Sequence, residues 1–245
     1  MLFSVIIINY KQKEFLVNCV NSIKENLKAE YEIIVVNNSP ESDDLTFKDV
    51  TILNNSNKGF SNANNIAAKY AKGKYLLFLN ADTVLKKDFS TKFLSEFEER
   101  DFGIVGLSLR FPNGSYQLSY WNENTFLNEF KNKKAEKNFK PENISRGNNS
   151  LKQDTVKEVD WVSGAAMVVS KSWFDKVNGF DEDFFLFYED ADLCKRISDS
   201  GGKVFYLPFD GLVHFKGENV NQSFRSDTYF YSKQSQLIYY KKHND

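Results

Sequence analysis

The chain has 245 residues, of which 41% are hydrophobic and 27% charged, as in soluble globular domains. Its 32 basic and 33 acidic residues leave a formal net charge of −1. This balance argues against nucleic acid as a partner, because proteins that bind a phosphate backbone carry a basic excess. No apolar run approaches the roughly 20 residues of a membrane span, and the run Leu2–Ile8 has no basic residue ahead of it, so we expect neither a span nor a signal peptide.

The first 110 residues alternate short apolar runs with helical patterns, which predicts a doubly wound α/β core. Four β-prone runs suit strands that are covered on both faces of a sheet: Val5–Ile8, Ile33–Val36, Val50–Leu53 and Tyr75–Leu79. Apolar residues at helical spacing predict helices over Glu14–Leu27, over Ser61–Lys72 and after Asp88.

The composition of the sequence changes after residue 110. Residues 122–158 are polar and lysine-rich, which indicates a mobile insertion or a segment that orders on a partner. Regular structure resumes at Val159–Val169, followed by a predicted helix over Asp190–Ser200 and a strand over Val204–Leu207. A last helix is expected over Thr228–Lys242. We expect one domain over residues 1–245.

The two cysteines, Cys19 and Cys194, fall in helix-like patterns with no CxxC or Cys/His neighbour. We expect reduced core side chains and a cytoplasmic protein. The aromatic and lysine-rich C-terminal stretch leaves peripheral contact with the inner face of the cell membrane open, although packing of its aromatic residues on the core is favoured. The residues concerned are Tyr229, Phe230, Tyr231, Tyr239, Tyr240, Lys241 and Lys242.

Polar clusters follow the predicted strands of the first half. Ligands of doubly wound sheets sit beyond the carboxyl ends of the strands. Each cluster alone is what a turn would use, but four at one edge favour a shared ligand pocket. They are Asn9-Tyr10, Asn37-Asn38-Ser39, Asn57-Lys58-Gly59-Phe60 and Asn80-Ala81-Asp82.

Three features could carry chemistry. Asp82 at a strand end could hold a hard divalent cation against substrate phosphates, or it could cap a turn. Glu189, Asp190 and Asp192 follow an aromatic run and open a helix, where they could complement the helix dipole or supply a desolvated general base. A lone histidine such as His214 is more often structural.

The ordered series of motifs resembles the inverting family 2 glycosyltransferases of the GT-A fold, in the bacterial rhamnosyltransferase-like branch. The resemblance implies an α/β fold with one Rossmann-like, doubly wound mixed sheet flanked by helices, an acceptor-side insertion and a C-terminal helix. The motifs that carry it, besides the four clusters above, are Ser4–Tyr10, Tyr75–Asp82, Trp161–Ala165, Gly179–Glu182 and Tyr188–Leu193.

The resemblance also implies roles. Residues 1–110 would bind the nucleotide-sugar donor, and residues 111–245 would bind a saccharide or lipid-linked saccharide acceptor and hold the base. Asp190 would be that catalytic base, and Asp82 with His214 would hold Mg²⁺ or Mn²⁺ at the diphosphate. The donor would contact Asn9, Tyr10, Asn37, Lys58, Gly59, Asn64, Asn80, Ala81 and Asp82, and the acceptor Trp161, Gly164, Ala165 and Glu189.

Two positions depart from the family pattern. Asn37 and Asn80 stand where the family usually has aspartate, although asparagine at the position of Asn80 is common in this branch. The resemblance therefore implies an inverting transfer from a nucleoside diphosphate sugar in bacterial surface polysaccharide synthesis. The expected donor is dTDP-L-rhamnose. A UDP-hexose-using transferase and a carbohydrate-binding pseudoenzyme are the alternatives. A dehydrogenase is disfavoured because no GxGxxG occurs.

Overall fold

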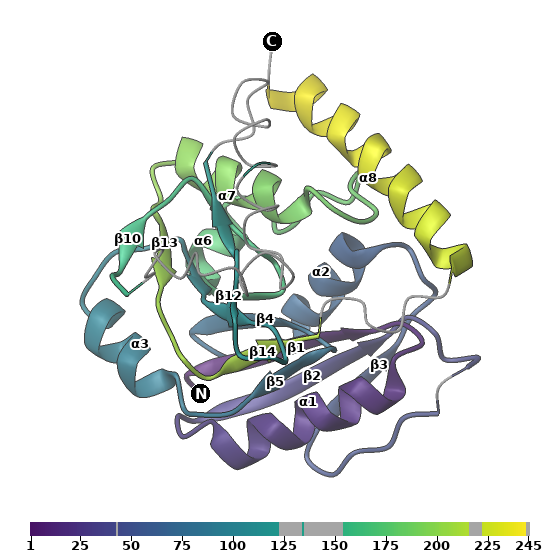
Figure 1. The fold of residues 1–245 in the computed structure, drawn as a ribbon, viewed down its shortest axis with the longest axis horizontal. Coiled ribbons are helices and arrows are strands. Elements are labelled where there is room, and N and C mark those ends of the chain that lie inside the picture. The colour runs from purple at the N-terminus through teal and green to yellow at the C-terminus, as the bar shows by residue number, and fades with distance from the viewer. Residues whose placement is uncertain (43, 123–133, 135–153, 216–221, 244–245) are drawn as a thin grey trace.

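A computed structural model describes residues 1–42, 44–122, 134, 154–215 and 222–243, and for residues 222–226 it describes the helix alone. Most of the segment 122–158, for which we expected mobility or ordering on a partner, lies outside these residues. The described elements form a layered α/β structure (Figure 1). Both halves of the chain contribute strands to its central sheet.

Within the described residues, eight strands form the central sheet in the order β10-β13-β6-β12-β4-β1-β2-β3. β4, β1, β2 and β3 run parallel, β12 is antiparallel to β4 and β6, and β10 is antiparallel to β13, so the sheet is mixed as expected. Their bounds are β1 (Phe3–Asn9), β2 (Tyr31–Asn37), β3 (Thr51–Asn54), β4 (Tyr75–Asn80), β6 (Ile104–Leu107), β10 (Lys157–Glu158), β12 (Ala166–Ser170) and β13 (Val204–Leu207).

Helices cover both faces of this sheet because its strands are apolar on both sides. Side chains of α1 (Lys13–Asn26) and α3 (Ser90–Phe97) enter the core cluster on one face. Those of α2 (Phe60–Tyr70), α6 (Lys171–Lys176) and α7 (Glu189–Asp199) enter the cluster on the other. The long α8 (Gln222–His243) lies against α7 (Figure 1), through a third cluster of Phe184, Ala191 and Tyr239.

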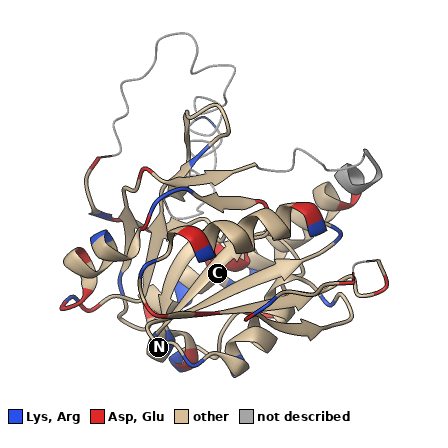
Figure 2. Ribbon diagram, turned by 90° about the horizontal axis from the view of Figure 1, so that it is seen from below, with Lys and Arg blue, Asp and Glu red and all other residues tan. Residues whose placement is uncertain are grey.

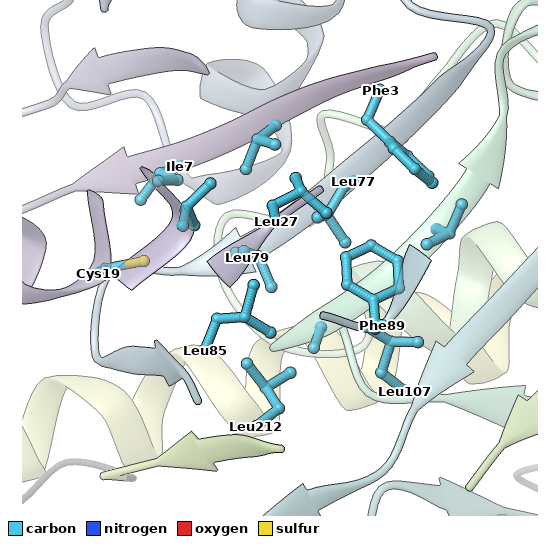
Figure 3. Packing of buried hydrophobic residues seen from close by; sticks show 14 of the residues in the cluster. Phe3, Ile7, Cys19, Leu27, Leu77, Leu79, Leu85, Phe89, Leu107 and Leu212 are labelled. Atoms are coloured by element: carbon cyan, nitrogen blue, oxygen red, sulfur yellow. The ribbon is translucent and has the colours of Figure 1, made fainter. Parts of the chain in front are cut away.

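The first core cluster contains Cys19 among aliphatic and aromatic side chains, including Phe3, Leu79 and Phe89 (Figure 3). Both cysteines are buried and free, as predicted. Burial raises the pKa of the Cys19 thiol to about 12 and that of Cys194 further still. Both sulfurs are therefore protonated packing groups at neutral pH, and neither provides a nucleophile.

Two smaller sheets accompany the central one. Their strands are β5 (Thr83–Leu85), β14 (Leu212–His214), β7 (Leu109–Arg110) and β8 (Tyr116–Gln117) in one, and β9 (Tyr120–Trp121) with β11 (Trp161–Val162) in the other. The antiparallel register of β14 on β5 pairs His214 with Thr83, and Phe215 N–H donates to the Asp82 carbonyl. This pairing brings His214 to Asp82 across more than half the chain.

The predicted helices and strands are confirmed, with ends shifted by one or two residues in most cases; α8 begins earlier than Thr228, at Gln222. Acidic and basic residues are interspersed over the described part of the chain (Figure 2), in keeping with the near-zero net charge. Among the described helices, none combines the length and the apolar character that crossing a membrane requires.

Candidate functional site

The carboxyl ends of β1 and β2 carry a buried pair of amides. Asn9 and Asn37 face each other in register, and Asn9 Nδ2 donates to Asn37 Oδ1 over 3.1 Å. The Ser39 N–H donates to the same oxygen over 3.2 Å. Both amides are almost fully buried, which neutral side chains tolerate when their hydrogen bonds are made. The structure thus brings the two predicted donor residues together, while their contact with a nucleotide stays a prediction.

The end of β4 carries the second cluster. Asp82 Oδ1 lies 3.2 Å from His214 Nε2, and Asn80 Nδ2 lies 3.4 Å from the same nitrogen. On the other side of the ring, Nδ1 lies 2.9 Å from Gln117 Oε1. Asp82, His214 and Gln117 are all buried. The histidine is therefore held from both sides, and its ring is oriented toward the carboxylate.

This cluster fits a divalent cation. Because the Gln117 oxygen only accepts, the neutral ring carries its proton on Nδ1, a tautomer inferred from that partner. Nε2 then directs a lone pair toward the Asp82 carboxylate, and a metal ion could accept both groups as ligands. Two ligands of Mg²⁺ at right angles lie about 3 Å apart, close to the 3.2 Å seen here. Within the described residues no three or more His, Cys, Asp and Glu side chains are grouped so that they could hold a metal ion; the other ligands of a cation here would be water or substrate oxygens.

The other predicted donor residues are placed less uniformly. Tyr10 is half-buried and Lys58 is exposed. Gly59 precedes α2 with φ 101°, and a Cβ there would lie 2.7 Å from the Phe185 carbonyl oxygen, so glycine is required at this close approach. Ala81 is buried in the first core cluster, leaving only its backbone for a ligand. The side chain of the buried Asn64 donates a hydrogen bond to the Phe60 carbonyl within α2. This hydrogen bond does not involve the Asp82 cluster.

Asp190 stands in the first turn of α7. Its Oδ2 accepts from the Gly164 N–H over 2.9 Å and its Oδ1 from the Ala191 N–H over 2.8 Å. Burial raises the pKa of the Asp190 carboxyl, against the lowering effect of these two N–H groups. A Cβ on Gly164 would lie 3.3 Å from Asp190 Cβ, so the glycine allows the carboxylate to approach. A carboxyl with a raised pKa that is oriented by backbone donors suits a general base.

The neighbouring Glu189 is 6% exposed. Its Oε2 has no hydrogen-bond partner in the described structure. Burial first, and then the nearby charges of Asp190 and Asp192, raise the pKa of Glu189 well above its ordinary value. The sequence pattern left two interpretations open here, complementing the helix dipole and desolvation of a carboxylate beside the aromatic run. Burial raises the pKa of both Glu189 and Asp190, as the second interpretation requires, although Phe187 of that run is exposed.

A short path of backbone hydrogen bonds joins the two clusters. The Asn80 N–H donates to the Ala165 carbonyl over 3.0 Å, and Gly164, one residue earlier, donates to Asp190. The antiparallel pairing of β12 with β4 creates this path. Asp82 and Asp190, which are 108 positions apart in the printed sequence, are thus connected through two neighbouring strands.

Trp161, predicted to bind the acceptor, lies beside this site. Its ring stacks on Trp121 with centroids 4.2 Å apart, and with Ala191, Lys195 and Tyr239 it borders a cavity of about 210 Å³. An aromatic wall with polar groups around it is the kind of surface that saccharides contact. Sequence reasoning missed Trp121 because β9 is only two residues long, and it missed Gln117 because nothing in the pattern links that residue to His214.

Two family models match the chain. One is described as Glycosyl transferase family 2 and matches residues 4–159. The other is described as the N-terminal domain of galactosyltransferase and matches residues 151–218. The first range holds the amide pair and Asp82, and the second holds Asp190 and His214. The two matches together therefore cover all of the clusters described above.

Curated relatives agree. Rhamnosyltransferase WbbL of Escherichia coli K12 is 30% identical, over 96% of this chain and 91% of that protein. The N-acetylglucosaminyl-diphospho-decaprenol L-rhamnosyltransferase of Mycobacterium tuberculosis is 30% identical over a shorter stretch, 35% of this chain and 28% of that protein.

Solved structures share the fold at low sequence identity. The mannosyltransferase PcManGT from Pyrobaculum calidifontis, in complex with GDP-Man and Mn²⁺, matches with a TM-score of 0.63 and 14% identity, over 98% of this chain and 64% of that one. GalNAc-T7 with UDP, GalNAc and Mn²⁺ matches with a TM-score of 0.61 and 14% identity, over 87% of this chain and 44% of that one. The chain has the GT-A fold and belongs to glycosyl transferase family 2, in its rhamnosyltransferase-like branch.

Proposed function

We propose that this glycosyltransferase moves a sugar from a nucleoside diphosphate donor to a hydroxyl group of a saccharide acceptor, with inversion and with the help of Mg²⁺ or Mn²⁺. The observation that carries the proposal is the backbone path from Asn80 through Ala165 and Gly164 to Asp190. This path fixes the position of the candidate base, Asp190, relative to Asp82 and His214, a carboxylate–histidine pair suited to a cation. A single displacement needs these two groups on opposite sides of one reacting carbon.

Asp190 takes the proton of the acceptor hydroxyl as its oxygen attacks the anomeric carbon. The new C–O bond forms while the bond from that carbon to the diphosphate breaks, and the nucleoside diphosphate leaves with the bonding electrons. The Gly164 N–H keeps one carboxylate oxygen in place. General-base catalysis of this kind contributes about 10²- to 10⁴-fold.

Asp82 and His214 would hold the cation, with Gln117 keeping the histidine ring in orientation. Bound there, a divalent ion supplies charge neutralisation for the departing diphosphate. The buried amides Asn9 and Asn37 are hydrogen-bonded to each other at the ends of β1 and β2. Together with Tyr10, Lys58, Gly59, Asn64, Asn80 and the backbone of Ala81, they are the residues proposed to contact the donor.

dTDP-L-rhamnose is the proposed donor and a saccharide or lipid-linked saccharide the proposed acceptor, in bacterial surface polysaccharide synthesis. Support comes from the two relatives, whose names state rhamnosyl transfer and, for one, a diphospho-decaprenol-linked N-acetylglucosaminyl acceptor. Trp161, Gly164, Ala165 and Glu189 are the residues proposed to bind the acceptor. Their place around Asp190 supports this assignment.

A donor panel tests the proposal. Purified protein is titrated with dTDP-, UDP- and GDP-sugars, with and without Mn²⁺, and both binding and release of the nucleoside diphosphate are measured. We expect metal-dependent binding of dTDP-L-rhamnose with slow hydrolysis. Preference for a UDP-hexose would replace the donor assignment but keep the reaction. Binding of no donor, in either condition, would favour a carbohydrate-binding pseudoenzyme.

The proposal includes work at the cytoplasmic face of the membrane. On α8, Tyr239 is buried, as packing requires, whereas Tyr229, Phe230 and Leu237 are 67%, 63% and 71% exposed. Apolar side chains that face outward next to lysines suit the interface of an anionic bilayer. Flotation with anionic liposomes, with and without lipid-linked sugar, tests this. Absence of the protein from the liposome fraction in both conditions would end the membrane assignment.

A further inference from the structure

The backbone just before the candidate base is strained. Phe187 and Tyr188 have φ angles of 71° and 64°, in the left-handed region that side chains with a Cβ rarely adopt. They end the segment 180–188, here named the base loop, and α7 with Asp190 begins at the next residue. Such conformations persist only where surrounding contacts hold them. The question is which contacts hold this one.

On one side, the base loop is bonded to the donor half. The Phe60 N–H donates to the Phe185 carbonyl over 2.8 Å. Asn65 bonds both the N–H and the carbonyl of Phe180, over 2.9 and 2.8 Å. These contacts hold the beginning and middle of the loop. They do not reach Phe187 and Tyr188.

On the other side, α8 contacts the loop where it is strained. Ser235 Oγ donates to the Leu186 carbonyl over 2.8 Å, and Ser235 is 2% exposed. One turn earlier, the Tyr231 ring stacks on Phe185 at 4.4 Å. One turn later, the Tyr239 ring lies 5.6 Å from that of Tyr188. Successive turns of α8 therefore lie against successive residues of the base loop.

The last turn of α8 reaches α7 itself. His243 Nε2 lies 2.8 Å from Asp192 Oδ1, and Arg196 Nε lies 2.7 Å from Asp192 Oδ2. Asp192 is fully buried, so each oxygen needs its donor. Next to His243, Lys242 contacts both Asp181 and Asp183 of the base loop. The turn that carries Asp190 is thereby tied to the end of α8.

We propose that Ser235 and His243 are positioning residues for the base at Asp190: Ser235 holds the strained base loop and His243, through Asp192, holds the first turn of α7. Without them, Asp190 loses its place against the Gly164 N–H. The inference rests on the proposed function, in which Asp190 takes the proton of the acceptor. It adds a requirement for a helix that contains neither the base nor the metal ligands.

The test compares Ser235→Ala, His243→Ala and the double variant with wild type. Gln234→Ala, at an exposed position of α8, is the matched control. We measure kcat for transfer, KM for the donor, and the number of donor sites per chain by calorimetric titration. Each single variant should lower kcat on the order of 10- to 100-fold, as expected for a misplaced catalytic group, with donor KM and site number unchanged. His243→Gln, which keeps an N–H donor for Asp192, should recover most of the loss.

Three outcomes decide the matter. Wild-type kcat in both single variants would overturn the inference. A fall in kcat that matches an equal fall in donor sites per chain would also overturn it, because it would show unfolding rather than misplacement. Asp190→Asn is run in the same assay. If it keeps full turnover, the proposed base is wrong; if only the α8 variants do, the base stands and its positioning by α8 fails.

Discussion

The two sides of the site bury polar groups in different ways. The side proposed to bind the donor, here called the donor side, has neutral amides, Asn9, Asn37 and Asn80, around a single carboxylate, Asp82. The side that carries the proposed base, here called the base side, places Glu189, Asp190 and Asp192 in one helical turn. Amides can be buried at little cost once they are hydrogen-bonded, and they hold no charge that pH could alter. Buried carboxylates repel one another, and desolvation raises the pKa values of Glu189 and Asp190.

This difference corresponds to two tasks. In the proposed function, binding a nucleotide requires fixed hydrogen-bond geometry that does not vary with protonation, and the amide pair would provide it. Accepting a proton requires a carboxyl group whose pKa has been moved from its ordinary value toward neutrality. The price is a cluster of charges that destabilises the turn unless it is compensated. Arg196 and His243 on Asp192, and the two N–H donors on Asp190, supply that compensation.

The largest expected effect separates the two sides. Asp190→Asn should reduce transfer by about 10²- to 10⁴-fold, because an amide cannot take the proton. Donor affinity should stay within about two-fold, since the residues proposed to contact the donor lie on β1, β2, β4, α2 and the turns beside them, and not on α7. Transfer kinetics and calorimetric donor binding measure both. Asp49→Asn, which changes an exposed carboxylate outside α7, serves as control. Wild-type turnover in Asp190→Asn would refute the assignment of the base.

The second effect concerns the donor side. Asp82→Asn keeps the shape of the side chain but removes its charge, so Mn²⁺ should no longer strengthen donor binding. Transfer should also slow, because the metal's stabilisation of the leaving group is worth several kcal/mol on the usual scale. Donor titrations with and without Mn²⁺ measure it. Asp49→Asn, at an exposed position with φ 57° that asparagine tolerates, should behave as wild type. An unchanged metal response in Asp82→Asn would place the cation elsewhere.

The smallest effect tests the cost of buried charge. The pKa of Glu189 is raised in the folded state, so between its ordinary value of 4.5 and the folded value the folded protein binds more protons than the unfolded chain. The free energy of unfolding therefore falls as pH rises through this window. Glu189→Gln removes that dependence and should gain up to about 1.4 kcal/mol per pH unit relative to wild type. Urea unfolding at a series of pH values measures the difference.

If the difference in the free energy of unfolding between Glu189→Gln and wild type stays constant from pH 4.5 upward, the Glu189 carboxyl is ionised in the folded protein. The raised pKa would then be wrong. Asp183→Asn is unsuitable as its control, because Asp183 pairs with Lys242. Glu25→Gln, exposed near the end of α1, provides the matched exchange. It should leave the pH dependence of stability unchanged.

Much of the fold followed from local pattern. Continuous apolar runs such as Val5–Ile8 and Tyr75–Leu79 predicted strands buried on both faces, and β1 and β4 are parallel neighbours in the sheet. The strand-end positions of Asn9, Asn37 and Asp82 were likewise readable, because parallel strands end at a common edge. Helix positions followed from apolar periodicity, as α1 and α7 illustrate. Which segments form helices and which form strands thus depended on interactions between residues close together in the sequence.

Contacts between distant segments were not readable in this way. Nothing in the sequence pattern indicated that Gln117 would orient His214, or that Trp121 would stack on Trp161. Short strands such as β8, β9 and β14 have too few residues for a periodic signal. Their pairing is decided by the surrounding packing and by the need of each backbone group for a partner.

The sequence by itself therefore determined the α/β class, the strand ends that carry polar groups and the acidic opening of α7, since these depend on periodicity and on turn chemistry. The tertiary structure alone decided that Asp82 meets His214, that Gly164 meets Asp190, and that α8 reaches Asp192. Sheet register and helix docking set such meetings, and both depend on the free energy of the whole packed chain rather than on neighbouring residues.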